Sequence, residues 1–135
     1  MIARLLIADH DPGFAQLVRR CFLCRGAVVS IALDVQECMA LARESAPNVI
    51  ILDPKLPGGG IAPVLNWLIE ESPIQPPLIV TLDGSERVEL PESLLLRIDL
   101  RLPRPQSLQE LMPFVERLEN AEAAVQPIDS PSRVN

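Results

Sequence analysis

Hydrophobic and polar positions along the chain form two kinds of segment. Short, almost wholly apolar runs, each ended by polar residues, are typical of strands buried on both faces of a parallel sheet. Longer segments whose apolar residues recur every three or four positions lie between them, as in helices that cover a sheet. This alternation predicts five strands and five helices, an α/β parallel sheet with helices on both faces. The expected strands are residues 4–8, 27–31, 49–52, 78–80 and 100–102.

Capping residues indicate where the first two helices begin. Asp11 and Pro12 form a typical N-cap and first helical position, and Gly26 is a plausible C-terminal cap. Asp34 predicts a second cap, before a helix over residues 35–45. The inner stripe of the first helix is expected to contain Phe14, Leu17, Val18, Cys21 and Phe22. Two further helices are expected at about residues 62–71 and 91–97.

The last helix is expected to begin at a capping box, Ser107 to Glu110. Pro113 should kink this helix, because proline has no N–H to donate to the carbonyl four residues before it. Periodicity is lost from about Ala121, which predicts one domain over residues 1–121 and a flexible tail or linker over 122–135. The expected inner face of this helix contains Leu108, Leu111, Met112, Val115 and Leu118.

Composition narrows the function. Apolar residues make up 48% of the 135 residues and aromatic residues only 3%, so one aliphatic core is expected. A net charge of −6 argues against direct binding to nucleic acid. No apolar run is long enough to span a bilayer, and the apolar start is too short for a signal peptide. We therefore expect a cytoplasmic protein with no membrane contact.

Two side-chain patterns allow other interpretations. Cys21 and Cys24 form a C-x-x-C pair, which suits redox chemistry or zinc, but no second ligand pair completes a tetrahedral site. The pair lies inside a helical pattern, so we interpret these cysteines as small hydrophobic residues. Trp67 is interpreted as a partly buried helix residue and not as a platform for a cofactor.

The residues at which the strands end carry the candidate chemistry, because ligands of parallel sheets bind at the C-terminal ends of the strands. Asp9 and Asp53, at two such ends, offer carboxylate oxygens that suit Mg²⁺. Thr81 and Arg104 add a hydroxyl and a fixed positive charge at two others. An aspartate between a metal and a cation can act as a nucleophile in phosphoryl transfer, forming an aspartyl phosphate.

In order and spacing, these residues resemble the receiver domain of bacterial response regulators, over about residues 3–120. Asp9-His10 stands where the family has its acidic pair, and residues 52–58 (Leu-Asp-Pro-Lys-Leu-Pro-Gly) resemble its phosphoacceptor loop. Val80-Thr81 matches the position of the family's hydroxyl residue. Residues 102–105 (Leu-Pro-Arg-Pro) stand where the family has a lysine followed by a proline. The resemblance implies a flavodoxin-like (βα)5 doubly wound sheet with strand order 2-1-3-4-5.

The resemblance also implies roles for single residues. Asp53 would be the phosphoacceptor, with Thr81 and Arg104 beside it. Asp9, Asp53 and the backbone carbonyl of Lys55 would hold Mg²⁺, with His10 at the position of the second acid. The implied partners are a histidine kinase or phosphotransfer protein, and a second copy or an output partner at the face of the fourth helix, fifth strand and fifth helix.

The chain departs from the family pattern at four positions. His10 replaces an acid, which weakens the expected Mg²⁺ site, because a neutral imidazole supplies no negative charge. Arg104 replaces the lysine with a bulkier, planar cation. Leu82 stands where the family prefers a small residue, and Arg101 occupies the position of the aromatic switch residue.

Three functions follow from these observations. The first is a receiver that is phosphorylated on Asp53 and is not itself an enzyme. The second is a degenerate receiver, a protein–protein interaction module whose state is set by binding. The third is a phosphatase of the haloacid-dehalogenase type, because residues 9–11 formally read D-x-D, but that class leaves Asp53 without a role.

Overall fold

The computed structural model describes residues 1–71, 76–82 and 89–125. Strands and helices alternate throughout this part of the chain, as the hydrophobic pattern predicts. The strands are β1 (Arg4–Ala8), β2 (Val28–Ala32), β3 (Val49–Leu52), β4 (Leu78–Leu82) and β5 (Leu100–Leu102). The helices are α1 (Pro12–Leu23), α2 (Val35–Ser45), α3 (Ala62–Glu71), α4 (Glu92–Leu95) and α5 (Leu108–Val125).

The five strands form one parallel sheet in the order β2-β1-β3-β4-β5, which confirms the predicted fold class and strand order. The order in which the strands are added changes side at β1. The chain first adds β2 on one side of β1, and it then adds β3, β4 and β5 on the other side. Ligand sites of doubly wound sheets lie at this switch point, at the C-terminal strand ends.

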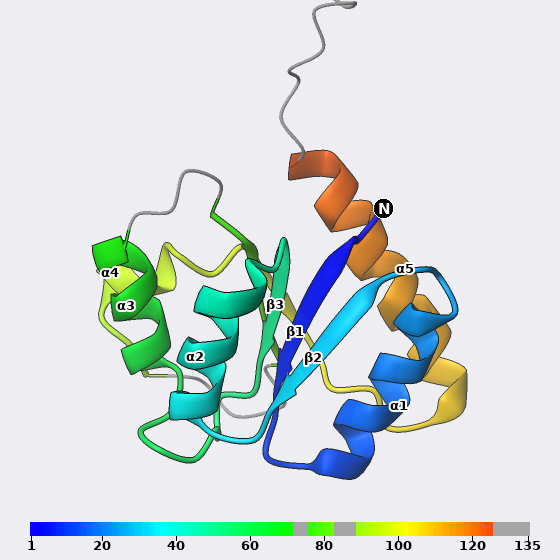
Figure 1. Cartoon of the computed structure of the whole chain (residues 1–135), viewed down its shortest axis with the longest axis horizontal. Helices are drawn as coiled ribbons and strands as arrows, with labels where there is room; N and C mark the ends of the chain where they lie inside the picture. The colour runs from blue at the N-terminus through cyan, green and yellow to red at the C-terminus, as the bar shows by residue number, and fades with distance from the viewer. Residues whose placement is uncertain (72–75, 83–88, 126–135) are drawn as a thin grey trace, which may run out of the picture.

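Helices cover both faces of the sheet (Figure 1). α1 and α5 lie on one face, and α2, α3 and α4 lie on the other. Each face has its own core of aliphatic side chains, and β1, β3 and β4 contribute residues to both, in alternation. Strands buried on both faces explain why their sequences are apolar runs without alternation.

The two predicted aspartate N-caps are present. The Asp11 carboxylate accepts hydrogen bonds from the backbone N–H groups of Gly13 and Phe14, at 3.0 and 3.3 Å. The Asp34 carboxylate accepts from the N–H of Glu37 at 2.8 Å. These bonds satisfy N–H groups that have no partner in the first helical turn, so short-range chemistry fixes where α1 and α2 begin.

The last helix differs from the prediction in its inner face and in its length. Leu108 and Met112, expected inside, are 71% and 45% exposed, whereas Phe114 is buried. Pro113 lies within α5, which continues past residue 121 to Val125. The expected tail therefore begins with a helical turn at 122–125, and its remainder, 126–135, lies outside the described residues.

Two smaller differences concern single residues. Leu17, expected in the inner stripe of α1, is 37% exposed, because it lies at the edge of that stripe. β4 extends two residues beyond the expected strand 78–80, so that Leu82 is its last residue and is buried. No helix in the described ranges is long and apolar enough to cross a membrane.

Candidate functional site

The C-terminal ends of three neighbouring strands bring the predicted site residues together. Register pairs Ala8 of β1 with Leu52 of β3, and Leu52 with Thr81 of β4. Asp9 and Asp53 therefore leave the sheet side by side, and the Asp53 N–H donates to the Ala8 carbonyl at 2.9 Å. Both carboxylates are buried, with 0% and 2% of each residue exposed.

Asp53 is surrounded by hydrogen-bond donors. Its Oδ2 accepts from the backbone N–H of His10 at 3.2 Å and contacts the Nδ1 of the same residue. Its Oδ1 accepts from the backbone N–H of Lys55 at 2.9 Å. Burial by itself raises the pKa of the Asp53 carboxyl, but the bonds from His10 and Lys55 outweigh burial and leave that pKa below its ordinary value. Asp53 is therefore an ionised carboxylate at neutral pH.

Asp9 is held by Arg104 and by the backbone of Asp11. The Arg104 Nη2 donates to Asp9 Oδ2 at 2.7 Å and lies 3.7 Å from Asp53 Oδ2. The Asp9 Oδ1 accepts from the backbone N–H of Asp11 at 2.9 Å. Burial raises the pKa of the Asp9 carboxyl above its ordinary value, although the Asp11 N–H and the Arg104 charge act in the opposite direction. The Arg104 guanidinium also lies 4.4 Å from the ring centroid of Phe14.

Thr81 is the last residue but one of β4 and is in register with Leu52, the residue before Asp53. The side chain is buried, and its hydroxyl oxygen has no hydrogen-bond partner. Buried hydroxyls are normally paired, because leaving one unpaired is costly. A group with acceptor oxygens beside Asp53 would satisfy this hydroxyl.

His10 decides which metal the site could hold. The ligand atoms of Asp9, His10 and Asp53 all lie within 4.8 Å of one another, the distance range of a shared metal ion. The two carboxylates suit Mg²⁺, whereas the imidazole nitrogen suits softer divalent metals. Arg104 already pairs with Asp9 and brings a competing positive charge. The donor set as a whole therefore fits Mg²⁺ poorly.

Four of the predicted residues lie together at the strand ends, where His10 and Arg104 each contact both Asp9 and Asp53. Lys55 meets Asp53 through its backbone N–H, and a role for its carbonyl in binding metal stays a prediction. Asp9 and Asp53 directly follow β1 and β3, at the C-terminal ends of these strands.

Two further residues have clear positions. The side chain of Asp11 caps α1 and is used there, which argues against a D-x-D phosphatase site. Phe14 was assigned by its spacing to the helix stripe alone. Its contact with Arg104 has no counterpart in the sequence pattern.

The chain is similar in sequence to mycobacterial response regulators. It is 31% identical over 111 residues to the transcriptional regulatory protein TrcR of Mycobacterium tuberculosis, which covers 81% of this chain and 42% of TrcR. It is 29% identical over 137 residues to the response regulator MprA of Mycobacterium sp., which covers 98% of this chain and 57% of MprA. The chain thus spans about half the length of these relatives. No protein-family model matches it.

Solved structures confirm the fold. A receiver domain protein (CheY-like) from Methanospirillum hungatei has a TM-score of 0.73 at 17% identity, covering 90% of this chain and 98% of that one. The receiver domain of the Francisella response regulator 1452 has a TM-score of 0.69 at 23% identity, covering 92% and 99%. Sequence similarity to response regulators and the shared fold point to the same family. The chain is a receiver domain of the response-regulator type.

Proposed function

We propose that this receiver is an atypical member of two-component signal transduction whose Asp53 accepts a phosphoryl group. The observation that carries the proposal is the buried hydroxyl of Thr81, which has no partner and lies one strand from Asp53. A phosphoryl group on the Asp53 carboxylate supplies the acceptor oxygens that this hydroxyl lacks. The donor would be the phosphohistidine of a histidine kinase or of a phosphotransfer protein.

In the proposed step, the N–P bond of the phosphohistidine breaks as a carboxylate oxygen of Asp53 forms a new O–P bond. The imidazole released from the donor takes up a proton. Arg104 stabilises the charge on the phosphoryl oxygens, since its Nη2 lies 3.7 Å from Asp53 Oδ2. The chain acts as a signalling module and not as an enzyme with its own small-molecule substrate.

A second function, that of a degenerate receiver, is favoured by a different observation. Arg104 pairs with Asp9, and His10 contacts Asp53, so both buried carboxylates have partners without a metal ion. A site whose two carboxylates are already paired needs no phosphoryl group to be stable. The state of the domain would then be set by the binding of a protein partner.

The two functions are separated by adduct formation. The chain is treated with acetyl phosphate or beryllofluoride, with and without Mg²⁺, and the adduct is followed by intact mass or fluorine NMR. An adduct that is lost in Asp53→Asn but retained in the matched exposed control Glu116→Gln supports the phosphoacceptor. If neither the native chain nor His10→Asp forms an adduct, the result supports the second function, a degenerate receiver that acts as an interaction module.

The proposed partner surface is the face of α4, β5 and α5, where an output partner or a second copy would bind. Large apolar side chains of this region are exposed: Leu96 (77%), Leu108 (71%) and Met112 (45%). Sedimentation of the native chain against Leu108→Ser tests whether the face joins two copies. With a net charge of −6, we propose a cytoplasmic module that contacts neither nucleic acid nor membrane itself.

A further inference from the structure

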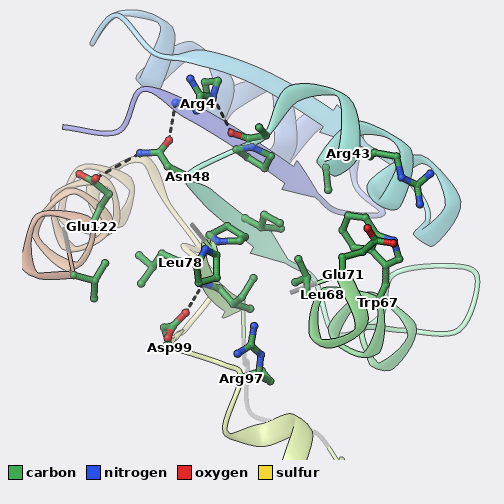
Figure 2. Close-up of a pocket in the computed structure, with 18 of the residues that line it drawn as sticks. Arg4, Arg43, Asn48, Trp67, Leu68, Glu71, Leu78, Arg97, Asp99 and Glu122 are labelled. Carbon is green, nitrogen blue, oxygen red and sulfur yellow. Dashed lines mark hydrogen bonds between the residues drawn. The ribbon is translucent and has the colours of Figure 1, made fainter. Parts of the chain in front are cut away.

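A cavity of about 1270 Å³ is lined by residues that include Arg4 and Leu78 (Figure 2). These are the first residues of β1 and β4, so the cavity lies at the end of the sheet opposite to Asp53. Its walls come from α2, α3, the first residues of β4, the segment that follows α4, and the end of α5. The volume exceeds the roughly 300–1,000 Å³ of most small-molecule sites. Apolar side chains form part of the wall, among them Leu68, Leu78 and Ile79.

Two buried N–H groups without partners belong to residues that line this cavity. They are the indole Nε1 of Trp67 and the Nε of Arg97. Within the described residues, the only other buried side-chain atom without a partner is the hydroxyl of Thr81, at the phosphoacceptor end. Because both cavity groups are donors only, a ligand that satisfies them must offer acceptor atoms.

Positive charge at the cavity is left uncompensated. The Arg43 guanidinium lies 5.4 Å from the centroid of the Trp67 ring. Neither Arg43 nor Arg97 makes an ion pair in the described part of the chain. A ligand with a negative charge would be attracted by both.

The acidic residues of the wall are mostly engaged. Glu122 pairs with the α-amino group of Met1 at 3.0 Å. The carboxylate of Asp99 accepts the backbone N–H of Ile79 at 2.7 Å, and Glu71 is the remaining acid of the wall. The charges available to a ligand are therefore mainly positive.

We propose that this cavity binds a small organic anion, with an apolar body against Leu68, Leu78 and Ile79 and a carboxylate near Arg97 and Trp67. The apolar wall selects the body, and the unpaired N–H groups select the acceptor oxygens. The site lies at the other end of β4 from Thr81. It does not depend on the phosphorylation of Asp53.

The experiment uses phenylbutyrate as the probe and phenylbutanol as its uncharged analogue, both titrated into the full chain. Trp67 is the only tryptophan and the chain has no tyrosine, so intrinsic fluorescence reports on one wall of the cavity. Backbone amide chemical shifts give a second readout. We expect saturable binding of phenylbutyrate, about tenfold tighter than that of phenylbutanol, because charge-assisted hydrogen bonds are lost with the alcohol.

Three variants locate the site. Arg97→Gln should weaken phenylbutyrate about tenfold, and Trp67→Phe, followed by amide shifts, should weaken it several-fold. Arg117→Gln is the matched control, since Arg117 is exposed on α5 and is absent from the cavity wall. Equal binding of acid and alcohol, no saturation, or equal losses in Arg97→Gln and Arg117→Gln would each overturn the proposal.

Discussion

The guanidinium of Arg104 lies 2.7 Å from Asp9, a carboxylate that is fully buried. The Arg104 side chain itself is 24% exposed, so water screens the pair only in part. Burial of an unpaired carboxylate is costly, and Arg104 is the cation that compensates for it here. The ion pair therefore links the stability of the domain to the same residue that faces Asp53.

Replacing Arg104 with methionine tests this link. The variant keeps an apolar chain near Phe14 but leaves the charge of Asp9 without its cation. We expect the free energy of unfolding to fall by about 1–3 kcal/mol at neutral pH, below the cost for a fully buried pair because Arg104 is partly exposed. Urea denaturation measures the change, with Arg117→Met as the control. The loss should narrow at acidic pH, where Asp9 is protonated, and a pH-independent loss would contradict the ion-pair explanation.

A second prediction concerns the metal. His10→Asp adds a carboxylate to Asp9 and Asp53, and we expect Mg²⁺ to bind at least about tenfold more tightly than to the native chain, because hard cations prefer oxygen ligands. Calorimetric titration gives the affinities. His10→Asn removes the imidazole without adding charge and should give a smaller gain. If both variants gain equally, loss of the imidazole alone explains the effect.

The unpartnered hydroxyl of Thr81 leads to a prediction in which stability and function oppose each other. Thr81→Val keeps the shape and removes the unpaired polar atom, so the free energy of unfolding should rise by roughly 1 kcal/mol. The same variant should bind beryllofluoride more weakly. Thr81→Ser keeps the hydroxyl and serves as the control for adduct formation. A destabilised valine variant would mean that the hydroxyl has a partner in solution.

The carboxyl of Asp53 should make stability depend on pH in a defined direction. Burial raises the pKa of the Asp53 carboxyl in the folded chain, but the hydrogen bonds from His10 and Lys55 have the larger combined effect. They leave this pKa below the ordinary 3.8. A lowered pKa contributes stability that is present above the unfolded value and is lost as pH falls through the folded value. Urea denaturation of the native chain and of Asp53→Asn, repeated from neutral to acidic pH, measures this effect. The difference between their free energies of unfolding should change in this pH window. NMR titration should place Asp9 above and Asp53 below 3.8, and the reverse order would refute the assignment.

The cysteines provide a test of burial. Burial, with a smaller effect from the charge of Asp34, raises the pKa of the Cys38 thiol to about 12, whereas Cys24 is exposed. Since the thiolate is the reactive form, Cys38 should be alkylated by iodoacetamide roughly a hundredfold or more slowly than Cys24 in the folded chain. Mass spectrometry of timed samples measures both rates. In urea the two rates should converge, and slow alkylation there would rule out burial as the cause.

Much of the fold could be predicted from local features. Apolar runs marked the strands, and Asp11 and Asp34 marked helix starts through bonds that span only two or three residues. The inner face of α5 could not be predicted, because the periodicity of a helix does not determine how the helix is rotated against the sheet. That rotation buries Phe114 and leaves Leu108 exposed.

Strand ends also predicted which site residues would meet, since the ends of parallel strands share one edge. The pairing of their side chains could not be predicted. Whether Arg104 turns to Asp9 or to Asp53 depends on rotamers and on the ring of Phe14, which lies 90 positions away in the sequence. The cavity at the opposite end of the sheet could not be predicted either, because Trp67 and Arg97 belong to no shared motif.

β4 separates the two ends of the molecule. All of its five residues are buried, and apolar side chains fill the space between the hydroxyl of Thr81 at one end and the cavity at the other. Neither His10 nor Arg104 belongs to the aliphatic cores. Substitutions at the Asp53 end can therefore leave the far cavity unaltered, so each end of the scaffold can change without the other.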